Sequence, residues 1–209
     1  MDYRLICLLI GYAIGCIQMA YLICKWAGGI DIRKHGSGNA GTTNVVRVMG
    51  AKMGLLILVL DIAKGIAAFL ICAALFSGGS AYSTGEMGLI PGLYGALGAV
   101  VGHDFPIQLK GRGGKGSATT IGIILLLDWR IALICCLAGV ATIVLTRYVS
   151  ATSMLIACLM VILLALFGYP LEIVCIGAMI AGLSLYQHRA NIDRLLNGKE
   201  NKITFKKQV

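Results

Sequence analysis

A glycine-rich polar stretch, residues 36–47, contains the first group of side chains that could do chemistry. Its glycines tolerate positive φ and lack Cβ atoms, so the backbone can turn its N–H groups toward a ligand. Arg47 adds a fixed cation whose planar fork suits phosphate. These features predict a site for an oxyanion. The candidate residues are Ser37, Gly38, Asn39, Gly41, Thr42, Thr43, Asn44 and Arg47.

Two other interpretations fit parts of this stretch. A polar, glycine-rich segment between apolar helices can serve only as a connector. Its glycine spacing also fits the dinucleotide-binding fingerprint, which requires a preceding strand inside a βαβ unit. A membrane-length apolar run precedes it here, so we reject dinucleotide binding.

A second glycine-rich loop, residues 110–117, combines glycines with lysine and arginine. Its spacing departs from that of nucleotide phosphate loops, because a glycine follows Lys115 where those loops have serine or threonine. Backbone N–H groups, cations and a following helix start still predict anion binding. The alternative to anion binding is a flexible hinge that carries ordinary cytoplasmic cations. The presence of two such loops argues against this alternative. The candidate residues are Lys110, Gly113, Gly114, Lys115 and Gly116.

Histidines could add acid–base or hydrogen-bonding groups. His103 follows the third apolar run and is a candidate general base or orienting group, although a histidine at a helix end is often structural. His188 and Asn191 are three residues apart, so they share a face if their segment is helical. Ser37 could orient a substrate group or act as a nucleophile, but no base partner is evident in the sequence.

The composition indicates a membrane protein. Hydrophobic residues make up 58% of the chain and charged residues 13%, which exceeds the apolar content that a soluble domain needs. The net charge of +9 does not indicate nucleic-acid binding. The lysines and arginines lie in short loops and the C-terminal tail, where the positive-inside rule expects them. We therefore expect the lipid bilayer as a partner, with the oligomeric state left open.

Apolar runs near the length of about 20 residues that crosses a bilayer recur along the chain, some of them shorter. They are roughly Leu5–Ala27, Met53–Phe76, Leu89–Val101, Ala118–Leu127, Ile131–Leu145, Ser150–Phe167 and Ile173–Tyr186. They predict an all-α, polytopic fold of about seven transmembrane helices, forming a single domain over residues 1–209. Five spans with re-entrant pieces are the alternative.

Charge sets the predicted orientation. Basic loops alternate with loops that are not basic, which places the N-terminus outside and the C-terminus in the cytoplasm. In either arrangement the two glycine-rich loops and the His188 segment lie on the cytoplasmic side. They can therefore form one site there.

The apolar runs themselves carry three informative features. Asp61 and Lys64 are neighbours on one helix face, which favours a structural pair or support for the anion site over direct catalysis. Glycines at 92, 95 and 98 favour close helix packing. All eight cysteines lie in apolar runs without metal-ligand spacing, so we expect buried thiols, no disulfide, no metal and no cofactor.

Three motifs together resemble the bacterial PlsY family, membrane glycerol-3-phosphate acyltransferases that use acyl-phosphate as donor. The first is GIDIR followed by SGN, GxTN and R in residues 29–47; the second is GHxFP with GGKGxAT in residues 102–119. The third is HRxNIxRL with a glycine and a glutamate in residues 188–200, and DxxKG in residues 61–65 also fits. The resemblance covers most of the chain in the right order.

The resemblance implies acyl transfer from acyl-phosphate to the 1-hydroxyl of glycerol-3-phosphate, at the cytoplasmic side of a bacterial cytoplasmic membrane. The products would be lysophosphatidic acid and phosphate. We expect the backbone around Gly41, Thr42, Thr43, Gly113 and Gly114 to hold the phosphate of the donor. We expect Arg47, Lys115, His188 and Asn191 to hold glycerol-3-phosphate.

Departures and alternatives remain. The family usually has proline or a similar residue where Ala40 stands, alanine where Thr42 stands, and a Ser-Ile-Pro-like segment where residues 16–18 read CIQ. An organic-phosphate transporter is the alternative function, although it would need polar groups near the bilayer midplane and usually internal repeats. His188 and Asp193 also match the HxxxxD pattern of acyl-CoA acyltransferases, which we interpret as coincidence.

Overall fold

The computed structural model describes residues 2–76 and 86–203, and every regular element within those ranges is a helix. The predicted all-α class is confirmed. The described chain divides into two compact units, residues 2–123 and 124–203. The single acyltransferase domain expected for residues 1–209 stays a prediction. Most of the loop expected between the second and third apolar runs, residues 77–85, lies outside the described residues.

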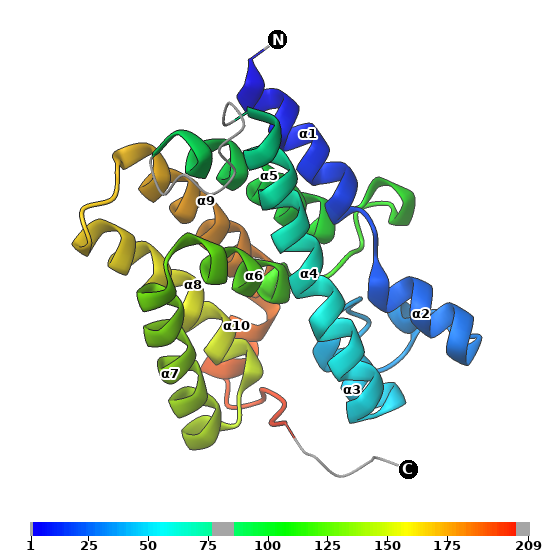
Figure 1. The fold of residues 1–209 in the computed structure, drawn as a ribbon. Helices are drawn as coiled ribbons and strands as arrows, with labels where there is room; N and C mark the ends of the chain where they lie inside the picture. The colour runs from blue at the N-terminus through cyan, green and yellow to red at the C-terminus, as the bar shows by residue number, and fades with distance from the viewer. Residues whose placement is uncertain (1, 77–85, 204–209) are drawn as a thin grey trace. The chain divides into compact units, whose positions relative to one another are not determined.

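The first unit is built on three helices that pack together, α1, α4 and α5 (Figure 1). Its elements are α1 (Tyr3–Gly15), α2 (Met19–Gly28), η1 (Ile32–Lys34), α3 (Thr42–Met49), α4 (Ala51–Phe76), α5 (Glu86–Asp104), η2 (Ile107–Leu109) and the start of α6 (Ser117–Leu127). Helix α5 packs closely against both α1 and α4, while α3 packs on α4 and α2. The third apolar run is therefore the centre of this unit.

Close contact in the first unit depends on glycine. A Cβ on Gly98 or Gly102 would collide with backbone carbonyls of α1. On the other side of α5, a Cβ on Gly92 would lie 2.8 Å from the Phe69 ring, and one on Gly95 would lie 2.6 Å from the Ala68 carbonyl oxygen. The tight packing predicted from the glycine spacing is confirmed.

The sequence predicted that the first apolar run is one continuous helix, but the structure shows two. Helix α1 ends at Gly15 and α2 begins at Met19, so the chain breaks at residues 16–18. No proline marks this break. It persists because side chains from distant parts of the chain bind the carbonyls that the break releases, a condition that any break at membrane depth must meet.

Four stretches are long and apolar enough to cross a membrane: Tyr3–Gly28, Ala51–Phe76, Trp129–Thr146 and Val149–Leu166. The bent pair α9 and α10 would make a fifth. Helices α5 and α6 correspond to the other two predicted runs. Among the described residues the count is thus four or five, and the seven-span topology and the placement of the termini stay predictions.

The second unit contains the end of α6, then α7 (Trp129–Thr146), α8 (Val149–Leu166), α9 (Leu171–Gln187) and α10 (Arg189–Leu196). Helix α8 packs between α7 and α9. Buried apolar side chains such as Leu164 and Ile176 fill the space between them. Short connections explain why consecutive helices are neighbours.

A polar cluster ties the start of α7 to the turn between α8 and α9. Asp128 caps α7, and its carboxylate accepts hydrogen bonds from the Arg130 guanidinium at 2.6 Å and the Tyr169 hydroxyl at 2.9 Å. The hydrogen bonds from Arg130 lower the pKa of Asp128 to about 2. These three polar side chains therefore have a structural role.

The burial expected for the cysteines holds for Cys7, Cys16, Cys24, Cys72 and Cys135. Cys136 and Cys175 are exposed, and Cys158 is half-buried, so the expectation was wrong for these three. In a membrane protein an apolar side chain need not be buried in the protein, because lipid can cover it. All eight are free thiols in the structure.

Candidate active site

Asn44 holds the first glycine-rich loop in shape. Its side-chain carbonyl accepts a hydrogen bond from the Ser37 backbone N–H at 2.8 Å. Its side-chain amide donates to three backbone carbonyls that surround it, those of Ile32, His35 and Asn39. Asn44 was expected to bind substrate, but its polar atoms are committed to the loop. Ser37 and Gly38 are exposed at the outside of the turn.

Residues 42–47 are helical, whereas the sequence had suggested a continuous loop. Gly41 has extended backbone and precedes α3, and burial of Val45 anchors the helix in the first unit. Thr42 and Thr43 lie in the first turn, where N–H groups have no acceptor inside the helix. Arg47 lies half-buried in the last turn.

An ion pair fixes the entry to this loop. The Arg33 guanidinium donates to the Asp31 carboxylate at 2.8 and 3.0 Å, and also to the Leu109 carbonyl of η2 at 3.4 Å. The same guanidinium lies over the Tyr21 ring, 4.9 Å from its centre. Hydrogen bonding to Arg33 holds the pKa of Asp31 at about 2. The sequence pattern contained this pair, but nothing in it indicated the contact with η2.

The second glycine-rich loop folds back onto the end of α5. The Gly113 N–H donates to the Asp104 carbonyl at 3.2 Å, and the Gly114 N–H donates to the His103 carbonyl at 3.0 Å. Backbone groups around Gly113 and Gly114 were expected to hold phosphate, but these two N–H groups themselves complete the C-terminus of α5. The N–H groups without an intrahelical acceptor belong instead to the first turn of α6, from Ser117 onward.

One hydrogen bond joins the two loops. The Ala40 N–H donates to the Gly113 carbonyl at 3.4 Å, although 73 positions separate these residues (113 − 40). The predicted residues of the first and second loops are therefore brought together in one unit. Lys115 is half-buried beside this junction, while Lys110 is exposed with a positive φ of 56° at the end of η2.

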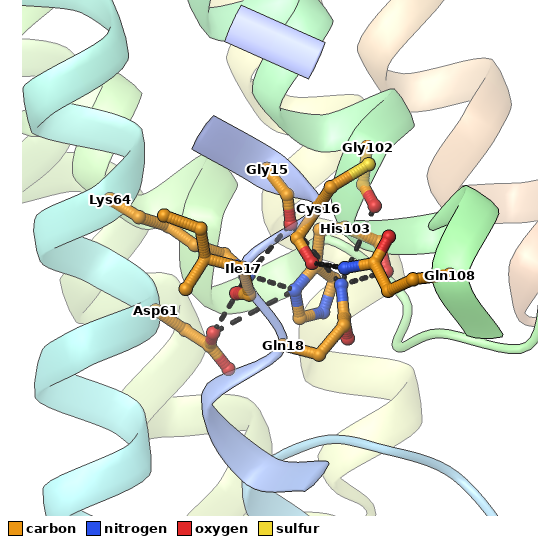
Figure 2. Close-up of polar contacts among 9 residues, drawn as sticks. All are labelled: Gly15, Cys16, Ile17, Gln18, Asp61, Lys64, Gly102, His103 and Gln108. Carbon is orange, nitrogen blue, oxygen red and sulfur yellow. Dashed lines mark hydrogen bonds and ion pairs between the residues drawn. The ribbon is translucent and has the colours of Figure 1, made fainter. Parts of the chain in front are cut away.

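Beneath the second loop lies a buried ionic cluster (Figure 2). Lys64 and Asp61 form an ion pair with Nζ and Oδ1 3.0 Å apart, which confirms the predicted pair. The same Nζ lies 2.6 Å from Nδ1 of His103. The side chains of all three residues are at most 5% exposed. The sequence analysis had identified each of the three residues, but it had not predicted that His103 contacts the other two.

Gln18 and Gln108 complete this cluster at the break between α1 and α2. The Gln18 side-chain amide donates to the carbonyls of Gly15 at 3.2 Å and His103 at 3.0 Å (Figure 2). The Gln108 amide donates to the Cys16 carbonyl. Both glutamines therefore bind carbonyls released by a helix end, and Gln18 also joins that end to α5. Sequence reasoning missed them because all their partners except Gly15 lie 84 to 92 residues away.

A separate cluster surrounds His188 in the second unit, where α9 and α10 meet at an angle of 59°. His188 is buried, and its Nδ1 lies 2.8 Å from the Ser184 carbonyl oxygen. Asn191, also buried, donates from its side-chain amide to the Glu200 carboxylate at 2.8 Å. His188 lies at the bend just before α10, whereas Asn191 lies inside it, so the predicted sharing of one helix face by the two residues stays a prediction.

Glu200 organises this second cluster. Its carboxylate accepts hydrogen bonds from Ser150 at 2.9 Å, Asn191 at 2.8 Å and Arg194 at 2.8 Å. Burial opposes the charged form, but the three hydrogen bonds outweigh it and hold the pKa of Glu200 below its usual value. The glutamate therefore orients Asn191 as a fixed anion.

Asp193 does not belong to this arrangement of hydrogen bonds. It is exposed, and its carboxylate accepts a 3.3 Å hydrogen bond from Asn197. The Nδ1 atom of His188 faces the Ser184 carbonyl oxygen. Across the described residues, no group of three or more histidine, cysteine, aspartate or glutamate side chains could hold a metal ion.

Comparisons with known proteins cover the chain that contains these clusters. The profile of the family described as Glycerol-3-phosphate acyltransferase matches residues 5–198, nearly the whole chain. The chain belongs to the glycerol-3-phosphate acyltransferase family. One relative of this name, from Shouchella clausii (strain KSM-K16), is 43% identical over 93% of each chain. Another acyltransferase of the same name, from Thermoanaerobacter sp. (strain X514), is 40% identical over 99% of each.

Two solved structures also share the acyltransferase fold. One is PlsY (YgiH), described as an integral membrane glycerol 3-phosphate acyltransferase, in its glycerol 3-phosphate form. It is 33% identical, with a TM-score of 0.85 over 97% of this chain and 96% of its own. The lysophosphatidic acid form of PlsY matches with 32% identity and a TM-score of 0.83 over 98% and 97%. The resemblance to the PlsY type is thereby confirmed.

Proposed function

We propose that this acyltransferase transfers a fatty acyl group from acyl-phosphate to the 1-hydroxyl of sn-glycerol-3-phosphate. The products are lysophosphatidic acid and inorganic phosphate. The observation that carries the proposal is the Ala40 to Gly113 hydrogen bond, which joins two glycine-rich cationic loops in one unit. Both substrates are phosphate anions, and paired loops of this kind suit a reaction in which two phosphates must be held together.

The chemistry needs no covalent intermediate on the protein. The hydroxyl oxygen attacks the acyl carbon, the bond between that carbon and the phosphate oxygen breaks, and phosphate departs with the electron pair. A mixed anhydride already has a good leaving group, so proximity and stabilisation of charge supply most of the acceleration. Among the described residues, the Ser37 hydroxyl makes no hydrogen bond to a base. We assign it to orienting substrate.

Cations and helix starts divide the binding task in this proposal. Thr42 and Thr43 at the start of α3 and the first turn of α6 receive the phosphate of the donor. Arg47 and Lys115 bind the phosphate of glycerol-3-phosphate, each as a half-buried cation. Relatives crystallised with glycerol 3-phosphate and lysophosphatidic acid support the choice of acceptor and product.

His188 is assigned to the acceptor hydroxyl. Its Nδ1 faces a carbonyl oxygen, which can only accept, so Nδ1 carries the proton. The lone pair of the neutral ring therefore lies on Nε2, where it can accept a hydrogen bond or the proton of the attacking hydroxyl. Asn191, oriented by Glu200, holds the same substrate. The departing phosphate is the alternative final acceptor of the proton.

All three motifs are proposed to act from the cytoplasmic side of a bacterial cytoplasmic membrane. The support is the distribution of lysine and arginine among the loops. Single cysteines at positions 37 and 115, in a cysteine-free background, test this in intact cells. Both should resist membrane-impermeant thiol reagents until the cells are opened. Labelling of either from outside intact cells would reverse the topology.

The donor is tested directly with purified protein. Acyl-phosphate, acyl-CoA and acylated acyl carrier protein are supplied in separate reactions with glycerol-3-phosphate, and lysophosphatidic acid is quantified. We expect turnover with acyl-phosphate alone. Equal turnover with acyl-CoA would refute the proposed donor while leaving the acyltransferase family unaffected.

A further inference from the structure

Lys64 is surrounded by acceptors at the break between α1 and α2 (Figure 2). Its Nζ lies 3.0 Å from the Asp61 carboxylate, 3.3 Å from the Gly15 carbonyl and 3.1 Å from the Ile17 carbonyl. Nδ1 of His103 is the fourth neighbour and lies at 2.6 Å. The carboxylate charge and the carbonyl dipoles stabilise a protonated amine, whose three hydrogens are shared among these four neighbours.

The charge on Lys64 decides which nitrogen of His103 carries the proton. An ammonium group has donors and no acceptor, so Nδ1 must present its lone pair at this short distance. A neutral amine receiving a proton from Nδ1 is the alternative. It would place the Asp61 carboxylate, 3.0 Å from Nζ, beside an uncharged group. Lys64 therefore fixes a neutral His103 with its hydrogen on Nε2.

The Nε2 edge of that ring faces the second glycine-rich loop. A Cβ on Gly114 would collide with Nε2 of His103, so the nitrogen lies directly against the Gly114 backbone. A Cβ there would also lie 2.7 and 2.8 Å from the two ring carbons that flank Nε2. Among the described residues, no hydrogen-bond acceptor for Nε2 is found. The Nε2 edge of the ring is thus aimed at the loop that contains Lys115.

We propose that Lys64 locks His103 as a hydrogen-bond donor and that its Nε2–H binds a phosphate oxygen of substrate at the second loop. This rests on the proposed function and deepens it. It gives His103 a binding role and excludes it as general base, because its basic nitrogen is turned toward Lys64. The phosphate belongs either to acyl-phosphate or to glycerol-3-phosphate, and the kinetic arms below distinguish them.

Two amide variants separate the nitrogens. In His103→Gln the side-chain amide can reach the position of Nε2 and donate there. In His103→Asn the shorter side chain reaches only the position of Nδ1, where its oxygen can accept from Lys64. We expect His103→Asn to raise KM for one phosphate substrate about tenfold, the loss of one hydrogen bond to a charged group. His103→Gln should recover most of that affinity.

The substrate whose KM rises identifies the phosphate bound by His103, and a rise for either supports the proposal. The pH dependence of kcat should keep its shape in His103→Gln, because no catalytic base has been removed. A general base would behave differently: His103→Gln would lose about a hundredfold or more in kcat and change the pH profile. That result, or unchanged KM values for both substrates in His103→Asn, would overturn the proposal.

The tautomer can be read without turnover. Nitrogen-15 NMR of histidine-labelled wild-type protein distinguishes a protonated ring nitrogen from one with a lone pair, and the signals absent from His103→Asn assign His103. We expect the proton on Nε2 and a shift of that signal when inorganic phosphate is added. A proton on Nδ1 would overturn the inference. Because this measurement uses no acyl donor, the tautomer of His103 can be determined even if the proposed reaction is wrong.

Discussion

His103 and His188 are the two buried histidines of the described chain, and their surroundings differ at one atom. Nδ1 of His103 faces an ammonium group at 2.6 Å, whereas Nδ1 of His188 faces a carbonyl oxygen at 2.8 Å. The first partner donates and the second accepts. The same side chain is therefore suited to donate from Nε2 in the first unit and to accept at Nε2 in the second.

The two regions also compensate their buried charge differently. In the first unit a lysine is stabilised by a carboxylate and by the carbonyls of a broken helix. In the second, the Glu200 carboxylate is stabilised by three side-chain donors, among them Asn191. The comparison shows that the hydrogen-bond partner of Nδ1 decides whether Nε2 donates or accepts. That partner lies outside the sequence motif that contains the histidine.

The largest effect is expected at His188. In His188→Asn the amide can keep the hydrogen bond to Ser184, but no acceptor remains at the position of Nε2. We expect kcat to fall by about a hundredfold or more, within the range for loss of a general base. His35→Asn, a change at an exposed histidine, is the control and should leave the rate unchanged. Loss of substrate affinity alone, with kcat preserved, would assign His188 to binding only.

Charge removal at the loops should have the next largest effect. Arg47→Ala and Lys115→Ala should each lower kcat/KM by about tenfold to a hundredfold, because a charge-assisted hydrogen bond contributes about 1.5–3 kcal/mol. Arg47→Lys should recover little if the contact is bidentate. Arg4→Ala, at an exposed side chain near the N-terminus, is the control. Wild-type kinetics from both Arg47→Lys and Lys115→Arg would contradict phosphate binding and indicate that the two cations only set the membrane topology.

Glu200 allows a stability test of the second region. Glu200→Gln should lower the free energy of unfolding at neutral pH by about 1–3 kcal/mol, since charge-assisted hydrogen bonds are weakened. The folded-state pKa of Glu200 is below its ordinary value of 4.5, so its stabilisation is present above that value. It disappears as the pH falls through the lowered pKa. Thermal unfolding of both proteins between pH 7 and pH 3 should therefore show a difference that narrows with acidity.

The smallest effect is expected at Asp193. Asp193→Asn should leave kcat and KM within about twofold of wild type, because the carboxylate is exposed and surface changes of this kind cost little. The same variant is the carboxylate control for Glu200→Gln. A loss of activity comparable to that of His188→Asn would revive the HxxxxD interpretation and with it an acyl-CoA donor.

Much of the fold could be predicted because apolar length and glycine spacing are local properties. The helices and the pairing of Asp61 with Lys64 followed from such patterns. The break at residues 16–18 and helix α3 could not be predicted. The break depends on Lys64, Gln18 and Gln108 together binding the carbonyls of residues 15–17, a condition visible only in three dimensions.

The candidate site shows the same limit. Glycine-rich composition correctly indicated two loops, and the hydrogen bond from Ala40 to Gly113 brings them together. Composition could not show that the N–H groups of Gly113 and Gly114 complete α5, because a carbonyl partner at a helix end competes with any ligand. Nor could a histidine's tautomer be predicted without its neighbour.

The central claim is that the joined loops hold both phosphates at the same time and that the acyl group moves directly between them. Initial rates measured with acyl-phosphate and glycerol-3-phosphate varied together test this most directly. The account predicts intersecting double-reciprocal lines and no acylated protein in the intact mass spectrum when glycerol-3-phosphate is absent. Parallel lines together with a stable acyl-enzyme would contradict it.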